Sequence, residues 1–112
     1  MSRYGEIRLL TGQRAVTAAG TPEKIKEAPE FVENKVITII ITAKYGNAGD
    51  IYITNTKDRA NASTVGEILP PGASIEYNVR KIGLDAYLNL AEIWIDAATS
   101  GDGISYSAFE VV

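Results

Sequence analysis

The chain contains no cysteine and no histidine among its 112 residues. Without cysteine it has no disulfide framework and no thiolate metal site, so packing and hydrogen bonds must stabilise the fold. Histidine and cysteine are also the side chains most often used for acid–base and nucleophilic catalysis at neutral pH. We therefore expect a protein that is not an enzyme and that has no catalytic residues, no metal site and no cofactor.

Basic charge and long apolar runs are scarce as well. The chain has 11 basic residues against 14 acidic ones, a formal net charge of −3. It lacks the basic excess of proteins that neutralise many phosphates, so we expect no nucleic-acid partner. No apolar run approaches the ~20 residues of a membrane helix, and the first residues lack the apolar stretch of a signal peptide. We expect a soluble chain made in the cytoplasm, with no membrane partner.

The composition that remains is typical of one globular domain. Hydrophobic residues make up 46% and charged residues 22% of the chain, unlike disordered proteins. A length of 112 residues is close to the commonest domain size and too short for two domains of ordinary size. We predict a single domain over 1–112 with its core in 34–112, and we interpret the less regular residues 1–33 as an N-terminal arm.

Short strand patterns follow one another along the chain. The strongest is 36–43, which is rich in β-branched residues on both faces and so predicts a central strand. Glycine-containing turns at 46–49 and 100–103 predict two hairpins, one after this strand and one before the last strand. Alternation of apolar and polar residues predicts the other strands, at 3–10, 13–19, 51–54, 73–80, 92–97 and 104–111.

The connecting segments are polar or contain proline. Thr11 and Gly12 separate the first two expected strands, and 55–66 predicts a surface loop. Residues 23–32 suggest an irregular connector because Pro29 disfavours a regular ladder, with a short helix over 22–26 as the competing interpretation. With no room for crossover helices, the pattern predicts an all-β, antiparallel two-sheet β-sandwich that is jelly-roll-like.

Acidic residues near turns are the remaining candidates for chemistry. Asp85, Asp96 and Asp102 carry oxygens of the kind that bind Ca²⁺, but their spacing matches no calcium loop. Aspartate and glycine are ordinary turn residues, so we interpret this group as turn chemistry. The glycines around Asp102 do not predict a phosphate loop either, because they lie between two strands and no helix follows.

Aromatic residues on strands are the better candidates for recognition. Trp94 shares a strand face with Glu92 and Asp96, so alternation places it outward, where packing under a loop is its commonest explanation and an interface is the next. With Tyr52 it also suggests a stacking platform for sugars. The candidate interface residues are Tyr4, Phe31, Lys57, Asp58, Arg59 and Trp94.

The segment from Lys35 to Val111 resembles a pattern found in small virion structural proteins of tailed bacteriophages and prophages. The pattern runs from a β-branched strand through an Asn/Gly turn, an Ile-Tyr-Ile strand and a Pro-Gly turn to an alternating strand. An Asn-Leu pair, an aromatic-Val/Ile-Asp strand and a final Ser-Gly-Asp-Gly-Ile/Val-Ser-Tyr hairpin follow. Trp94 stands where tyrosine is more usual. The matching segments are 36–43, 47–49, 51–54, 69–75, 89–90 with 93–96, and 99–106.

The resemblance implies a noncatalytic β-sandwich on a phage particle, such as a capsid decoration or stabilising protein, a head fibre protein or a tail accessory protein. Its location would be the virion, and its partner a viral capsid or tail protein. We expect a homo-oligomer, with a trimer favoured because decoration of a lattice requires matching symmetry axes. A carbohydrate-binding β-sandwich module is the alternative, and a small enzyme with two carboxylates converging in a pocket is a third hypothesis.

Overall fold

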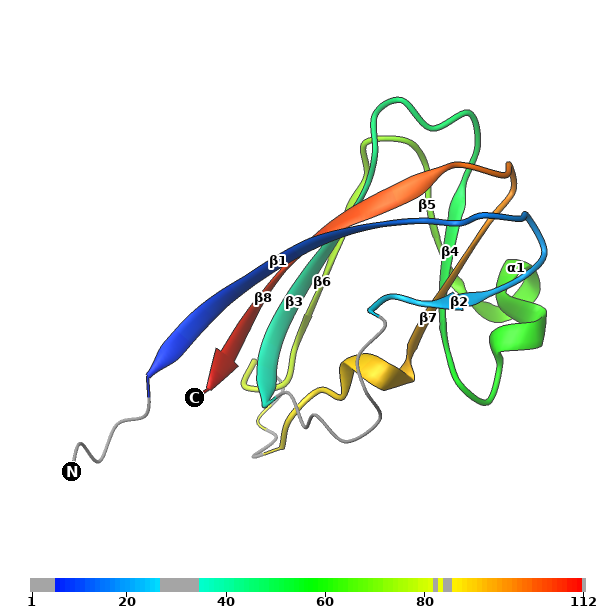
Figure 1. The fold of residues 1–112 in the computed structure, drawn as a ribbon. Helices are drawn as coiled ribbons and strands as arrows, with labels where there is room; N and C mark the ends of the chain where they lie inside the picture. Colours follow the sequence, from blue (N-terminus) through cyan, green and yellow to red (C-terminus); the bar gives the residue numbers. More distant parts are fainter. Residues whose placement is uncertain (1–5, 27–34, 82, 84–85, 112) are drawn as a thin grey trace.

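The computed structural model describes residues 6–26, 35–81, 83 and 86–111, and within them the strands form two antiparallel four-stranded sheets packed face to face (Figure 1). We name these sheet A, with strand order β1-β8-β3-β6, and sheet B, with order β2-β7-β4-β5. The all-β sandwich predicted from the sequence is confirmed. The strands are β1 (Ile7–Ala15), β2 (Glu23–Lys24), β3 (Val36–Ala43), β4 (Ile51–Asn55), β5 (Glu67–Leu69), β6 (Ser74–Asn78), β7 (Ile93–Ala97) and β8 (Gly103–Val111).

The strand pairing follows one simple rule, in which early strands pair with late ones. β1 pairs with β8, β2 with β7, β3 with β6 and β4 with β5. The chain is therefore one long antiparallel hairpin whose successive pairs fall alternately into sheet A and sheet B. Further pairing of β3 with β8 and of β4 with β7 joins the pairs within each sheet. This connectivity is that of a jelly roll.

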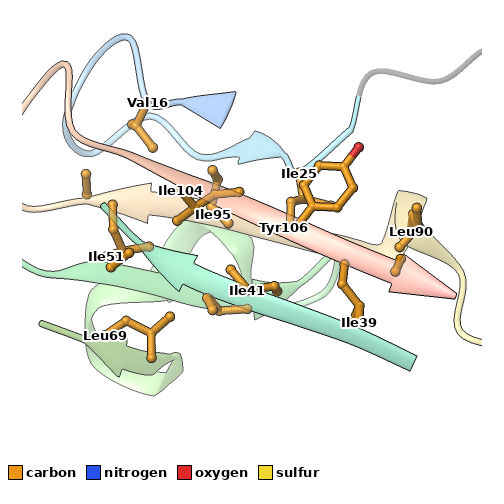
Figure 2. Packing of buried hydrophobic residues seen from close by; sticks show 14 of the residues in the cluster. Val16, Ile25, Ile39, Ile41, Ile51, Leu69, Leu90, Ile95, Ile104 and Tyr106 are labelled. Atoms are coloured by element: carbon orange, nitrogen blue, oxygen red, sulfur yellow. The ribbon is translucent and has the colours of Figure 1, made fainter. Parts of the chain in front are cut away.

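The core lies between the two sheets and is built from alternate residues of their strands. Ile39 and Ile41 of β3 and Ile104 of β8 are fully buried from sheet A, and Ile51 and Ile95 are fully buried from sheet B. Figure 2 shows these side chains directed into the space between the strands. Burying one such side chain contributes about 1.5–3 kcal/mol. β3 lies between β8 and β6, so the prediction of a central strand is confirmed.

The N-terminal part of the chain belongs to the sandwich, so the expected arm over 1–33 is wrong for its described residues. β1 pairs with β8 along its whole length, and β2 forms an edge of sheet B (Figure 1). Val16 and Ile25 are fully buried in the core. Glu23–Lys24 pairs with β7, so neither the irregular connector expected over 23–32 nor the competing short helix over 22–26 describes these two residues.

The expected break at Thr11 and Gly12 does not occur, because both residues continue the β1 ladder. Gly12 is opposite Tyr106, and a Cβ on Gly12 would lie 2.6 Å from the tyrosine ring. The aromatic ring thus covers the position that the missing side chain leaves open. Gly12 therefore indicates a close approach of the Tyr106 ring to the β1 backbone, and not a turn.

Both hairpins predicted at glycine turns are wrong. β3 is in sheet A and β4 in sheet B, while β7 is in sheet B and β8 in sheet A. The segments 46–49 and 100–103 are therefore corners at which the chain crosses from one sheet to the other. Gly101 has φ 90°, which suits glycine at such a corner. A turn pattern shows where a strand ends, but not which sheet the next strand joins.

Three short helices lie outside the sheets in the described part of the chain. They are η1 (Arg59–Asn61), α1 (Ala62–Val65) and η2 (Leu90–Glu92). The first two fill the predicted loop 55–66, where α1 packs against β4 and β7 and Ala62 is buried. In η2, the side chain of Asn89 accepts a hydrogen bond from the Ala91 N–H and caps the turn that leads into β7.

Candidate functional site

Trp94 is half-buried beneath the segment that connects β4 to β5. Its indole Nε1–H donates to Thr56 Oγ1 at 2.9 Å. Two cations lie over its ring, the Arg59 guanidinium at 5.1 Å and the Lys24 ammonium at 5.9 Å from the ring centroid. The structure thus places Arg59 over Trp94, and both belong to the candidate interface residues. It also shows that packing under a loop is the main use of this tryptophan.

The other predicted interface residues are distributed differently. Lys57 is exposed on the same connection. The Asp58 backbone N–H donates to Asn55 Oδ1 at 2.9 Å, and Asn55 Nδ2 donates to Asp58 Oδ2 at 3.2 Å, so Asp58 stabilises the turn after β4. Tyr4 and Phe31 lie outside the described residues.

Tyr52 and Trp94 do lie on the same outer face of sheet B. On β7 the partner of Tyr52 is Asp96 and that of Thr54 is Trp94, so the two aromatic residues are diagonal neighbours. Both are half-buried. The cations over the Trp94 ring occupy part of the surface that a sugar would need, which weakens the case for a carbohydrate platform.

Two acidic residues near turns hold the sheet corners together. Asp102 is buried and accepts hydrogen bonds from the backbone N–H groups of Ala48 at 3.0 Å and Gly49 at 2.9 Å. Asp96 is also buried and accepts from the N–H of Gly20 at 2.9 Å. These bonds agree with the turn interpretation. Asp85 lies outside the described residues, among which no group of three or more acidic side chains is placed to hold a metal ion.

A cleft of about 560 Å³ opens between β6 of sheet A and the neighbouring ends of β4, β5 and β7 in sheet B. We name it the acidic cleft because three carboxylates line it, those of Asp58, Glu67 and Glu92. The rings of Tyr77 and Tyr87 form part of its wall. Burial raises the pKa of the Tyr77 phenol, and the charge of Glu67 raises it further, so this hydroxyl stays protonated at neutral pH.

A second feature is the outer face of sheet A, where apolar side chains are exposed. Ile7 and Leu9 of β1 are 54% and 58% exposed, and Phe109 of β8 is 43% exposed. Leu9 is directly opposite Phe109 in the ladder, and Ile40 of β3 is also exposed on this sheet. We name these four residues the outer apolar patch. No other described strand pairs with the second edge of β1.

The chain matches no known protein family, and no curated protein is significantly similar to it. Within its described residues, no helix has both the length and the apolar character needed to cross a membrane.

Asp58 of the acidic cleft is one of the candidate interface residues predicted from the sequence, whereas none of the four residues of the outer apolar patch is. The exposure of Leu9 and Phe109 could not be predicted from the sequence, because a period-2 pattern does not say which face of a strand is covered. Glu67, Tyr77 and Tyr87 come from three separate segments that meet only in the folded chain. Glu67 and Tyr77 lie in β5 and β6, and Tyr87 lies in the connection that precedes η2, so no common sequence signal links them.

Proposed function

We propose that the protein is a noncatalytic structural component of a tailed-phage particle, of the capsid decoration, stabilising or fibre type. In this proposal it acts on the virion by assembling with copies of itself, with a trimer favoured, and by binding a capsid or tail protein. The observation that carries the proposal is the outer apolar patch on sheet A, beside the unpaired edge of β1.

The patch is unusual for an antiparallel sandwich, whose outer sheet faces are commonly polar. Contiguous exposed apolar residues on a folded chain indicate an interaction surface. A nine-residue edge strand adds a row of backbone donors and acceptors that another chain can pair with. Together they supply side-chain and main-chain contacts in one place, which suits permanent assembly better than catalysis.

The fold and the sequence resemblance support the same proposal at a coarser level. Jelly rolls are common in viral capsid proteins and in lectins. Fold alone does not assign a function, but here the phage-like order of segments in 35–111 points to the first class. The cations over Trp94 argue against the second.

Light scattering at several concentrations tests self-assembly. We expect a mass of three chains, and we expect Leu9→Lys and Phe109→Lys to shift the population to monomers because a buried ammonium without a partner is costly. Ile68→Lys is the matched control, since Ile68 is 54% exposed but lies on sheet B. A parent chain that remains monomeric at the highest concentration would overturn the proposed oligomer. If all three substitutions dissociate the oligomer equally, the outer apolar patch is not its interface.

A further inference from the structure

The acidic cleft has the shape of a binding site. Its volume of about 560 Å³ lies within the ~300–1,000 Å³ that is usual for ligand sites. Ile53, Val65, Leu88 and Ile93 line it with apolar surface. These side chains offer contacts to an aliphatic stem.

The charges on the cleft have one sign. Asp58, Glu67 and Glu92 line it, and no lysine or arginine is among its described lining residues. The neighbouring arginines are engaged beside it: Arg80 lies over the Tyr87 ring at 5.4 Å, and Arg59 lies over Trp94. A group that enters the cleft therefore meets three acidic residues and, among the described lining residues, no ammonium or guanidinium group, although the Arg80 guanidinium lies beside Tyr87 of the lining.

The aromatic wall favours the same sign of guest. The Tyr87 ring already carries the Arg80 guanidinium at 5.4 Å, an example of a cation held at this wall, and the Tyr77 phenol is the other aromatic group of the lining. Tyr77 is half-buried, and its burial together with the charge of Glu67 raises its pKa, so a cation beside Tyr77 would meet the same negative charge. An anionic guest would be repelled here, and a neutral apolar guest would leave the carboxylates without partners.

We propose that the acidic cleft binds an arginine or lysine side chain presented by a protein partner, with the aliphatic stem against the apolar wall and the cationic head beside Glu67 and Tyr77, within reach of the charge of the other acidic lining residues. This site lies apart from the outer apolar patch. The proposed binding of a basic side chain therefore does not depend on the proposal that the protein is part of a phage particle. Arginine is the stronger guest, because its planar guanidinium can stack on a tyrosine ring and bind a carboxylate through two N–H groups.

Titration with short capped peptides, followed by amide chemical shifts, tests this proposal. The probes are acetyl-Gly-Arg-Gly-amide, its lysine counterpart and its citrulline counterpart, which keeps the shape of arginine without the charge. We expect saturable shifts at residues 53–55, 87–89 and 93 with the arginine and lysine peptides only. We also expect binding to weaken as salt is added. Shifts of equal size with citrulline, or no shifts at these residues, would overturn the proposal.

Charge-removing variants identify the site. Glu67→Gln and Glu92→Gln should each weaken arginine-peptide binding about threefold, and about tenfold when combined. Glu6→Gln, which removes an exposed carboxylate outside the cleft, should leave binding unchanged. If all three variants weaken binding equally, the effect is one of net charge and the proposed site is wrong.

The phenol of Tyr77 gives a second readout. A bound guanidinium should lower the pKa of Tyr77, which is measurable by ultraviolet titration with Tyr77→Phe as the reference. No change in this pKa at saturating peptide would contradict placement of the cation in the cleft. Light scattering on the same samples gives the oligomeric state, so that a change in peptide binding can be distinguished from a change in self-assembly.

Discussion

At the scale of residues, the acidic side chains near turns act as ties between backbone segments. Asp102 lies next to Gly101 and Gly103 at the corner between β7 and β8, and it accepts two N–H groups from the corner between β3 and β4. Asp96 binds the N–H of Gly20 in the crossing from β1 to β2 in the same way. The jelly roll needs such crossings between sheets, and buried carboxylates satisfy N–H groups there that no ladder can reach.

Asp102→Ala should lower the free energy of unfolding by about 2–3 kcal/mol, because two N–H groups lose a charged acceptor. Asp102→Asn should cost less, since one amide oxygen still accepts a bond. Urea denaturation followed by tryptophan fluorescence measures both. Equal losses for the two variants, or no loss for alanine, would show that the two bonds do not stabilise the corner.

At the scale of elements, β1 is one continuous strand, Ile7–Ala15, where the sequence predicted two short strands at 3–10 and 13–19. It runs unbroken through Gly12, because the Tyr106 ring from β8 occupies the side-chain space at that position. Its inner residues close the core, while Ile7 and Leu9 remain exposed on its outer face. The same strand therefore completes sheet A and supplies half of the outer apolar patch.

Gly12→Ala should destabilise the fold by about 1–3 kcal/mol, since the new methyl group overlaps the buried ring. In a Tyr106→Ala background the same substitution should have little effect, because the ring is gone. Thermal or urea unfolding of the four chains gives the coupling energy between the two positions. Additive effects would mean that the ring and the glycine are not coupled.

At the scale of the whole molecule, the jelly roll joins the two ends of the chain. Ile7 pairs with Val111, and Ala15 with Gly103 (Figure 1). These pairs close very long loops, whose entropy must be lost before the contacts form. In sheet B, by contrast, β4 and β5 are linked by a single short connection.

We expect slow folding for a chain of this size, with refolding in roughly milliseconds to seconds rather than microseconds. Stopped-flow tryptophan fluorescence measures the rate, and Trp94 on β7 is a suitable probe because its environment depends on β2 and η1. A variant that weakens only the β1–β8 pairing, Gly12→Ala, shows whether this long-range pair forms before or after the transition state. Refolding in microseconds would contradict the expected dominance of long-range pairing.

Much of the fold could be predicted from the sequence, and little of the sites. The strand 36–43 and the alternating segments near 75–79, 93–97 and 104–111 identified sheet residues correctly, because burial on one face imposes a period of two. Most failures concerned which strands pair, although the short strands β2 and β5 were also not predicted. Hairpins were expected where the chain changes sheet, and residues 7–25 were assigned to an arm although they form two edge strands. Local patterns carry no information on which distant strand lies alongside.

The sequence alone determined the class of the protein, an all-β sandwich without the side chains of common catalytic sites, because composition and periodicity are local properties. Only the tertiary structure decided that 7–15 pairs with 103–111, that Trp94 lies under Arg59, and that Glu67, Glu92 and Tyr77 share one cleft. The physical reason is that these contacts join residues far apart in the chain. The free energy of these contacts depends on how the sheets pack, and not on the residues that flank each position.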